Sequence, residues 1–302
     1  MARERGRIPC AAGSLARHEP IMATASRVRR WLLVEQPGPW GREALLESRL
    51  DDTIARALRS RARRANTRVV LIRRPGWSPS EGTRVYLVRS DPRTRWVREF
   101  PLSEPGSALD IDLQLLAESH PPTAGVSGPV SLHLICTNGR HDPCCADLGR
   151  PVVRSLQDDG VSDVWECSHI GGDRFAANMV FLPTGVYYGR VPPEEAARLV
   201  AQHDAGMLDL EYYRGRSCYQ PLTQAAEILV RRELNERGID ALRLTSTQKV
   251  DDDTSAALFA RGEDDVVEIT VRRHAGEPEH LTCSESGAGH PWRYDLIDLQ
   301  RR

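Results

Sequence analysis

Short apolar runs alternate with longer amphipathic segments through most of the chain, and this alternation is what most restricts its possible folds. The run WLLVE at 31–35 is followed by a helical pattern at 44–64 and by TRVVLIRR at 67–74. The runs VSLHLIC at 130–136 and VWEC at 164–167 flank another helical segment, GRPVVRSLQDDG. A strand, a helix and a second strand in this order are typical of a parallel strand–helix–strand unit. The chain is therefore predicted to be an α/β protein that contains two such units.

The first unit is extended by a predicted hairpin and ends at a stretch with linker composition. RVYLVRS and TRWVREFPL show short alternating patterns on either side of Asp91 and Pro92, which favours a hairpin on the same sheet. Pro, Gly, Ser and Thr then concentrate at 119–129, as in a loop between domains. We therefore predict a first domain at 27–122.

The second unit continues with two more strands and a helix. The segment 176–191 alternates as two strands around a turn, and 192–206 opens with prolines and glutamates and ends in glycine, which indicates a helix. The order strand–helix–strand–strand–helix is the thioredoxin-like arrangement. It is predicted for residues 127–208, and the first domain is predicted to be a degenerate thioredoxin-like copy.

The two ends of the chain are less regular. Residues 1–26 show no clear periodicity, are taken as an N-terminal extension without an assigned fold, and contain Met22 as an alternative start. Residues 209–302 hold a helical segment and strand candidates such as EHLTC at 279–283, which indicates a C-terminal α+β region. The predicted fold is thus α/β, with two thioredoxin-like domains in tandem and a C-terminal α+β extension.

Composition excludes several classes of protein. Hydrophobic residues make up 40% and charged residues 27% of the 302 residues, as in ordinary globular proteins. A formal net charge of −1, with Lys249 as the single lysine, gives no reason to expect a nucleic-acid partner. No apolar run approaches the roughly 20 residues that span a bilayer, and the N-terminus lacks the apolar core of a signal peptide. No membrane insertion is expected, and the predicted location is cytoplasmic.

Candidate metal ligands gather in CTNGRHDPCC at 136–145 and WECSHIGGD at 165–173. Cys136 closes a predicted strand, and Cys144 and Cys145 follow a turn. Because neighbouring side chains diverge, one of these two is expected to be a ligand and the other to pack. In the second stretch, His169 and Asp173 are four residues apart, a spacing that brings both to one side of a helical turn or tight loop.

Other readings of the cysteines remain open. Gly171 and Gly172 have no side chains, so their backbone N–H groups could approach the sulfurs of an iron–sulfur cluster. Zinc accepts two thiolates with His and Asp, but its usual thiolates lie two to four residues apart, unlike Cys136 and Cys145. A thioredoxin-type disulfide would need a C-x-x-C motif, which the chain lacks.

Long motifs resemble the sucrase/ferredoxin-like family, whose members are thioredoxin-like ferredoxins. The resemblance rests on CTNGRHDPCCADLGRPVV, VWECSHIGGDRFAANMVFLPTGVYYGRV, RGRSCY and the opening WLLVEQPGPWGREALLESRL, so it covers nearly the whole chain. It implies a [2Fe–2S] cluster held by two cysteines with eight residues between them and by an H-x-x-x-H motif. Carried over, the implied ligands are Cys136, Cys145 and His169, with Asp173 in place of the second histidine. Cys167 and Cys144 are the alternates for that fourth position.

The resemblance implies a single-electron carrier that works with an unidentified redox protein, a reductase or a terminal oxidoreductase. It is more an electron carrier than a catalyst, and no glycosidase chemistry is found. The alternative is a structural zinc or iron–sulfur protein that senses redox state or organises partners. A third reading is a thiol-dependent enzyme that uses Cys136 or Cys145.

Several residues outside the ligand set receive weaker expectations. Arg150, Arg154 and Arg174 could offset cluster charge or dock an acidic donor, although solvated surface arginines are the simpler reading. Cys218 and Cys283 are expected to pack, and Cys10 is given no role. Trp31 and Trp40 are expected to pack at the interface of the first domain.

Overall fold

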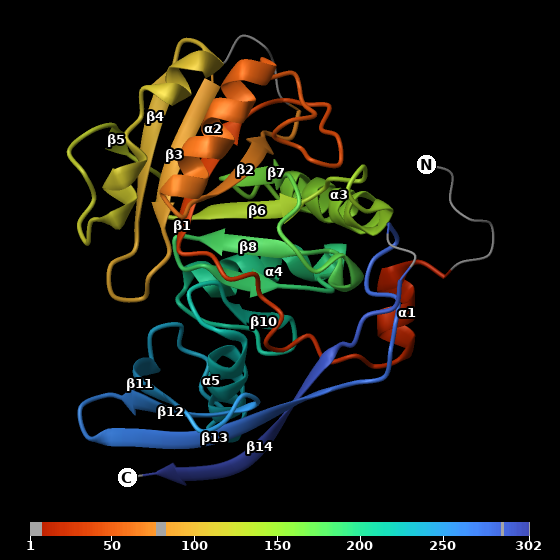
Figure 1. The fold of residues 1–302 in the computed structure, drawn as a ribbon, viewed down its shortest axis with the longest axis vertical. Helices are drawn as coiled ribbons and strands as arrows, with labels where there is room; N and C mark the ends of the chain where they lie inside the picture. The colour runs from red at the N-terminus through yellow and green to blue at the C-terminus, as the bar shows by residue number, and fades with distance from the viewer. Residues whose placement is uncertain (1–7, 77–82, 285–286, 302) are drawn as a thin grey trace.

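The protein is a mixed α/β structure with one large curled sheet and one smaller antiparallel sheet (Figure 1). A computed structural model describes residues 8–76, 83–284 and 287–301. The large sheet has ten strands in the order β10-β9-β8-β6-β7-β2-β1-β3-β4-β5, and the small sheet has the order β11-β12-β13-β14. Within the described residues, no helix is both long and apolar enough to cross a membrane.

The large sheet takes strands from residue 30 to residue 216. In chain order they are β1 (Arg30–Glu35), β2 (Arg68–Arg73), β3 (Thr83–Arg89), β4 (Trp96–Leu102), β5 (Val126–Ser127), β6 (Leu132–Cys136), β7 (Val164–Cys167), β8 (Met179–Leu182), β9 (Val186–Tyr188) and β10 (Tyr213–Arg216). The small sheet consists of β11 (Arg243–Lys249), β12 (Thr254–Arg261), β13 (Asp265–Ala275) and β14 (Trp292–Arg301). The helices are α1 (Cys10–Ala16), α2 (Asp52–Arg64), α3 (Pro143–Asp158), α4 (Pro193–Asp204) and α5 (Pro221–Glu233), with short 3-10 helices η2 (Pro105–Leu109), η3 (Leu113–Ala117) and η4 (Asp173–Phe175).

The two halves of the large sheet repeat one strand order. The order is β2-β1-β3-β4 in the first half and β7-β6-β8-β9 in the second. In each half the first pair is parallel and the other pairs are antiparallel. The halves join edge to edge where β2 pairs antiparallel with β7, through Ile72 with Cys167 and Arg73 with Glu166. Whether each half forms a separate domain, at the predicted boundaries, stays a prediction.

The large sheet curls until strands far apart in its order touch. Trp31 on β1 and Tyr187 on β9 have ring centroids 6.4 Å apart, and the rings of Tyr86 and Trp165 are 5.8 Å apart. Both pairs belong to one buried cluster that includes Cys136 and residues from each half. Trp31 therefore packs between the halves as expected. Trp40 does not, because it packs with α2 on the other face of the first half.

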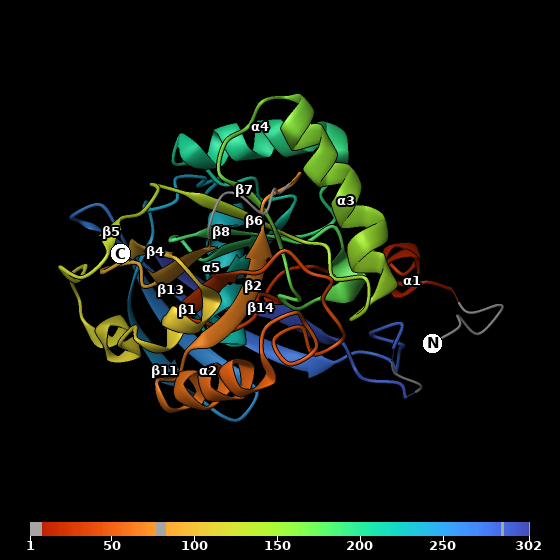
Figure 2. The same cartoon turned by 90° about the horizontal axis from the view of Figure 1, so that it is seen from above.

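Helices cover both faces of this sheet (Figure 2). The helices α3 and α4 pack against each other and against the second half, whereas α2 covers the first half on the opposite side. Helix α5 packs against β12 and β13 and so joins the small sheet to the rest. The strand β10 lies in the region predicted as C-terminal, yet it forms the edge of the large sheet beside β9.

Several elements differ from their predicted bounds. Helix α2 begins at Asp52 because Asp51 caps it, accepting hydrogen bonds from the N–H groups of Thr53 and Ile54. EHLTC forms no strand beyond a single bridge at Glu279, whereas β11 and β12 were not expected. The described part of the N-terminal extension contains α1 and a buried stretch that includes Met22.

Candidate metal centre

Cys136 and Cys145 meet where β6 ends and α3 begins. Asp142 caps α3, its carboxylate accepting a hydrogen bond from the Cys144 N–H at 2.9 Å, and Pro143 occupies the first helical turn. Gly149 lets α3 approach β6, because a side chain there would overlap the Cys136 carbonyl oxygen. Cys144 and Cys145 therefore lie in the first turn of a helix rather than on a loop.

The loop between β7 and η4 supplies His169 and Asp173. Gly171 and Gly172 have φ values of +102° and +85°, a backbone conformation that favours glycine. A side chain at Gly172 would overlap the guanidinium of the fully buried Arg214. That guanidinium donates hydrogen bonds to the Gly171 carbonyl at 3.0 Å and to the Asn178 amide oxygen at 2.7 Å. Arg214 thus holds the loop, while a role for the glycines toward a cofactor stays a prediction.

The structure brings all four predicted ligands together. One donor atom each from Cys136, Cys145 and His169 lies within 4.8 Å of the others. Asp173 Oδ1 lies 2.9 Å from His169 Nδ1 and accepts a hydrogen bond from the Cys145 thiol at 3.2 Å. The cysteines are 1% exposed, whereas the His169 side chain is 23% exposed. The group therefore has a buried sulfur end and a histidine end that reaches solvent.

The two alternates lie elsewhere. Cys144 points away from Cys145 and contacts Cys10 and Cys283. Cys167 is fully buried on β7, and burial raises the pKa of its thiol. Neither is among the donors within 4.8 Å of Cys136, Cys145 and His169 in the part of the chain that the structure describes.

His141 joins the group without having been expected. Its ring stacks on His169 with centroids 3.6 Å apart and planes inclined by 17°. His141 Nε2 lies 3.8 Å from Asp173 Oδ2, and His141, His169 and Asp173 form a second set of donors within 4.8 Å. His141 stands between Cys136 and Cys145 in the sequence, so its position inside the first ligand-bearing stretch was the available signal.

The charges in the group are strongly coupled. Burial alone would lower the pKa of His169, but Asp173 and Cys136 raise it to about 9. The pKa of Cys136 is lowered, chiefly by the hydrogen bond from the Cys145 thiol and then by His169, although burial opposes this shift. Burial also opposes the lowered pKa of Asp173, which His169 stabilises as the carboxylate. The Cys136 thiolate and the Asp173 carboxylate are forms that bind metals, whereas a metal at His169 would have to displace the proton that the raised pKa favours.

The same residues can hold a metal. His169 Nδ1 is buried and makes no aligned hydrogen bond, although Asp173 Oδ1 lies close to it. With the thiol sulfurs of Cys136 and Cys145 nearby, His169 belongs to a donor set that suits a thiophilic metal.

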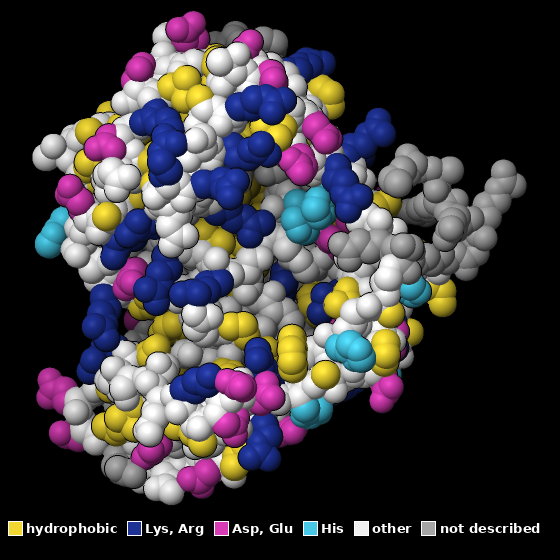
Figure 3. All heavy atoms as spheres, viewed as in Figure 1, with side chains coloured by type: hydrophobic (Ala, Val, Ile, Leu, Met, Phe, Trp, Pro, Cys, Tyr) yellow, Lys and Arg dark blue, Asp and Glu magenta, His cyan; other side chains and the backbone are white. Residues whose placement is uncertain are grey.

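The histidine end opens onto a basic surface. A shallow pocket is lined by His141 and His169 together with Arg42, Arg59 and Arg68. Figure 3 shows Lys and Arg side chains gathered over the upper half of this face, beside a histidine.

The three arginines singled out from the sequence do not line this pocket. Arg150 and Arg154 are exposed on α3. Arg174 is largely buried and forms an ion pair with Glu19 at 2.7 Å.

Comparison with known proteins agrees with the motifs. The family model described as sucrase/ferredoxin-like matches residues 21–215, a span that includes every residue of the centre. The chain belongs to the sucrase/ferredoxin-like family. The sucrase/ferredoxin-like match begins at the buried stretch before β1 and ends in β10, so it also includes Arg214.

One curated relative is similar over part of the chain. It is "Altered inheritance of mitochondria protein 32" of Debaryomyces hansenii, 35% identical over 95 residues. The match covers 28% of this chain and 35% of the length of the relative. No solved structure matches the chain significantly.

Proposed function

We propose that this member of the sucrase/ferredoxin-like family is a single-electron carrier with a [2Fe–2S] cluster at the candidate metal centre. The observation that carries the proposal is the convergence of Cys136, Cys145 and His169 within 4.8 Å, from three separate elements. A [2Fe–2S] cluster bound by thiolates and imidazole takes up and releases one electron. The chain would contribute the ligands, their burial and their charges.

The ligands would have different roles at the buried end and at the exposed end of the centre. Cys136 and Cys145 supply the thiolates in the core, where water is excluded. His169 lies at the surface end, which suits exchange of an electron with a partner. Arg214 is a fully buried cation behind the loop, and it favours the added negative charge of a reduced centre.

Two residues compete for the fourth ligand position. Asp173 has the predicted four-residue spacing from His169 and lies 2.9 Å from its Nδ1. His141 is the rival that the structure adds, since it stacks on His169 and belongs to the same donor set. A carboxylate is a harder donor than imidazole, so Asp173 as ligand would give a lower reduction potential than His141.

The scaffold would be thioredoxin-like in both halves of the large sheet. The repeated strand order, with its first pair parallel, supports this reading, and α4 follows β9 as the closing helix of the second half. The short helices η2 and η3 stand in the place of that helix in the first half. The first half contributes Arg42, Arg59 and Arg68 to the pocket but no cysteine between residues 27 and 122.

The redox partner would be a protein with an acidic docking surface. The pocket beside His169 places three arginines next to the exposed end of the centre. Complementary charge would steer such a partner to this face and make association sensitive to salt. A cytoplasmic location stays part of the proposal, although the name of the yeast relative refers to mitochondria.

The test is an EPR spectrum of the anaerobically purified, dithionite-reduced protein, together with its iron content. We expect a signal from a reduced [2Fe–2S] cluster and two irons per chain. Asp173→Ala and His141→Ala are compared with Cys167→Ala and, as a matched control, Cys218→Ala. The variant that changes the g-values or loses iron identifies the fourth ligand, and both controls should keep the wild-type spectrum. A colourless, iron-free protein would contradict the proposal.

A second candidate function rests on the pairing of Cys136 with His169. The pKa of the Cys136 thiol is lowered, first by the Cys145 thiol and then by His169, and the pKa of His169 is raised to about 9. In the metal-free protein these two residues therefore form a thiolate–imidazolium pair. Such a pair is the usual device of a thiol-dependent enzyme. Thiol-dependent turnover that survives removal of iron by a chelator would favour this function over electron transfer. A structural or redox-sensing zinc site would instead give a colourless protein that contains zinc.

A further inference from the structure

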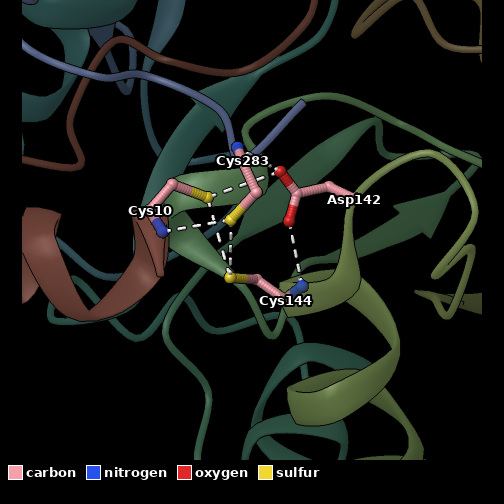
Figure 4. Close-up of side chains that lie close together, drawn as sticks. All are labelled: Cys10, Asp142, Cys144 and Cys283. Carbon is pink, nitrogen blue, oxygen red and sulfur yellow. Dashed lines mark hydrogen bonds between the residues drawn. The ribbon is translucent and has the colours of Figure 1, made fainter. Parts of the chain in front are cut away.

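A second group of metal-binding side chains lies beside the first. Cys10, Asp142, Cys144 and Cys283 point their sulfur and oxygen atoms toward one another (Figure 4). Cys10 opens α1, Asp142 and Cys144 begin α3, and Cys283 lies on the long connection between β13 and β14. All four donor atoms lie within 4.8 Å of one another.

Three donor–donor distances in this group match those of a tetrahedral metal site. Cys144 Sγ lies 3.7 Å from Cys10 Sγ and 3.6 Å from Cys283 Sγ. Cys10 Sγ lies 3.5 Å from Asp142 Oδ2. Four ligands around zinc, with Zn–S about 2.3 Å and Zn–O about 2.0 Å, give tetrahedral edges of about 3.8 Å between sulfurs and about 3.5 Å from sulfur to oxygen. The observed separations match these edges to within about 0.2 Å.

The charge of the group calls for a cation. Asp142 is fully buried, and among the described residues no Lys, Arg or His forms an ion pair with it. Its carboxylate accepts hydrogen bonds from the N–H groups of Cys144 at 2.9 Å and Cys283 at 2.7 Å, and it faces the Cys10 thiol. The N-terminus of α3 stabilises this negative charge only in part, and a divalent metal beside the three thiols would supply a full countercharge.

We propose that Cys10, Asp142, Cys144 and Cys283 bind one structural zinc ion. Asp142 and Cys144, two residues apart, form the local pair of ligands, and the other two come from segments far away in the sequence. On binding, each thiol releases its proton to water and each sulfur donates an electron pair to the metal. The site joins α1 and the β13–β14 connection to the start of α3.

Other states of these cysteines fit less well. A disulfide would bring two sulfurs to about 2.0 Å and leave the third cysteine without a partner. Thiols packed without a metal would also touch at these distances, but they would not balance the charge of Asp142.

The zinc site does not depend on the iron–sulfur proposal. Cys144 and Cys145 are adjacent, yet their side chains enter different groups, so each site keeps its own ligands. The two proposals can therefore fail separately.

The first measurement uses the full-length wild-type chain, purified anaerobically. We expect about one tightly bound zinc per chain, and a zinc-edge X-ray absorption spectrum with three sulfurs at about 2.3 Å and one oxygen at about 2.0 Å. Cobalt(II) added to the zinc-depleted protein should give the intense visible absorption of tetrahedral thiolate coordination. Wild-type protein without zinc that also fails to bind cobalt overturns the proposal.

Variants then separate the two sites. Cys10→Ser and Cys283→Ser should each lose the zinc and keep the iron, whereas Cys136→Ser should lose iron and keep this zinc. Cys218→Ser is the matched control, because Cys218 is buried and belongs to neither donor group, and it should keep both metals. Circular dichroism verifies that each variant is folded. Retention of zinc by folded Cys10→Ser and Cys283→Ser would overturn the proposal, as would a disulfide among the three cysteines found by mass spectrometry.

Discussion

Adjacent side chains at the start of α3 serve different groups, and this separation follows from local geometry. Consecutive residues in a helix point about 100° apart, so Cys144 and Cys145 cannot face one small site. Cys145 turns toward Cys136 and Asp173, and Cys144 turns toward Cys10 and Cys283. Divergence of the two cysteines was predictable from the sequence, but the direction of each was not.

A single glycine shows how tightly the loop around His169 is held. We expect Gly172→Ala to destabilise the protein more than Gly206→Ala does. Gly172 and Gly206 have φ values of +85° and +80°, so both substitutions carry the backbone cost of about 1–2 kcal/mol. Only at Gly172 does the added methyl group overlap Arg214, which adds about 1–3 kcal/mol. Urea unfolding of both variants measures the difference, and equal losses would contradict this account of the loop.

At single residues, sequence reasoning succeeded where the signal was local. The close approach of Cys136, Cys145, His169 and Asp173 was expected from motif and spacing, and the structure brings these side chains together. His141 was missed because its role depends on how the loop between Cys136 and Cys145 folds back. Cys10 and Cys283 could not be paired, because they are 273 positions apart in the sequence and only the tertiary fold brings them into contact.

Among the elements, α5 and β10 are joined by a fully buried set of charges. Glu227 on α5 accepts hydrogen bonds from Arg216 at 3.1 Å, from Arg231 at 3.1 Å and from the Tyr213 hydroxyl at 2.8 Å. All of these side chains are excluded from solvent. Two buried cations therefore depend on one carboxylate, and through it the small sheet is attached to the large one.

We expect Glu227→Gln to lower the free energy of unfolding by about 3–5 kcal/mol, because it leaves two buried guanidinium groups without their countercharge. The matched control is Glu195→Gln, which breaks an exposed pair with Arg198 and should cost less than about 1 kcal/mol. Urea denaturation at neutral pH gives both values. Similar losses for the two variants would show that the buried set contributes little.

The same carboxylate predicts a pH dependence. Burial alone would raise the pKa of Glu227, but Arg231 and Arg216 hold it below its ordinary value of 4.5. Because the pKa of Glu227 is lower in the folded than in the unfolded protein, its stabilisation is complete when the pH is above the unfolded-state pKa. The stabilisation is lost as the pH falls through the folded-state pKa. The gap in stability between wild type and Glu227→Gln should therefore narrow in acid.

Elements with strong local signals were predicted well, and those without them were not. Helix α4 has prolines and glutamates at its start and Gly206 after its end, and β8 and β9 flank a Pro-Thr-Gly turn, so all three were expected. Helix α3 was placed too late, although Asp142 and Pro143 are the usual start signal. The strand β11 was overlooked because nearly all of its residues are exposed and polar, and β12 was overlooked although its residues are buried or half-buried.

Across the whole molecule, one buried cluster spans both halves of the large sheet. Trp31 and Tyr86 from the first half pack with Trp165 and Tyr187 from the second. The pairing of β2 with β7 adds a short hydrogen-bonded seam, with an ion pair between Arg73 and Glu166 at 2.6 Å. Neither half can be separated from the other without exposing this cluster.

We therefore expect the two halves to unfold together. Tryptophan fluorescence reports on the cluster through Trp31 and Trp165, and far-ultraviolet circular dichroism reports on the helices of both halves. The two signals should give coincident urea transitions with a single midpoint. Two resolved transitions would contradict the shared core and would support independent domains at the predicted boundaries.

The strand–helix–strand order along the chain in each half was predicted from the sequence, whereas the joining of the halves was not. Each strand–helix–strand unit has its own local apolar pattern, which single-chain reasoning can detect. The contact of β2 with β7 and the packing of Trp31 on Tyr187 depend on how the curled sheet closes, and no short-range pattern encodes that.

The contact between Cys10 and Cys283 has a consequence for biosynthesis. Ribosomes add about 5–20 residues per second, so Cys10 is made on the order of tens of seconds before its distant partner. Throughout that interval the nascent chain carries a thiol that must escape oxidation. The contacts of Cys10 with Cys283 at the start of α3 can form only after translation has passed residue 283, so they are among the last contacts to form as the protein matures.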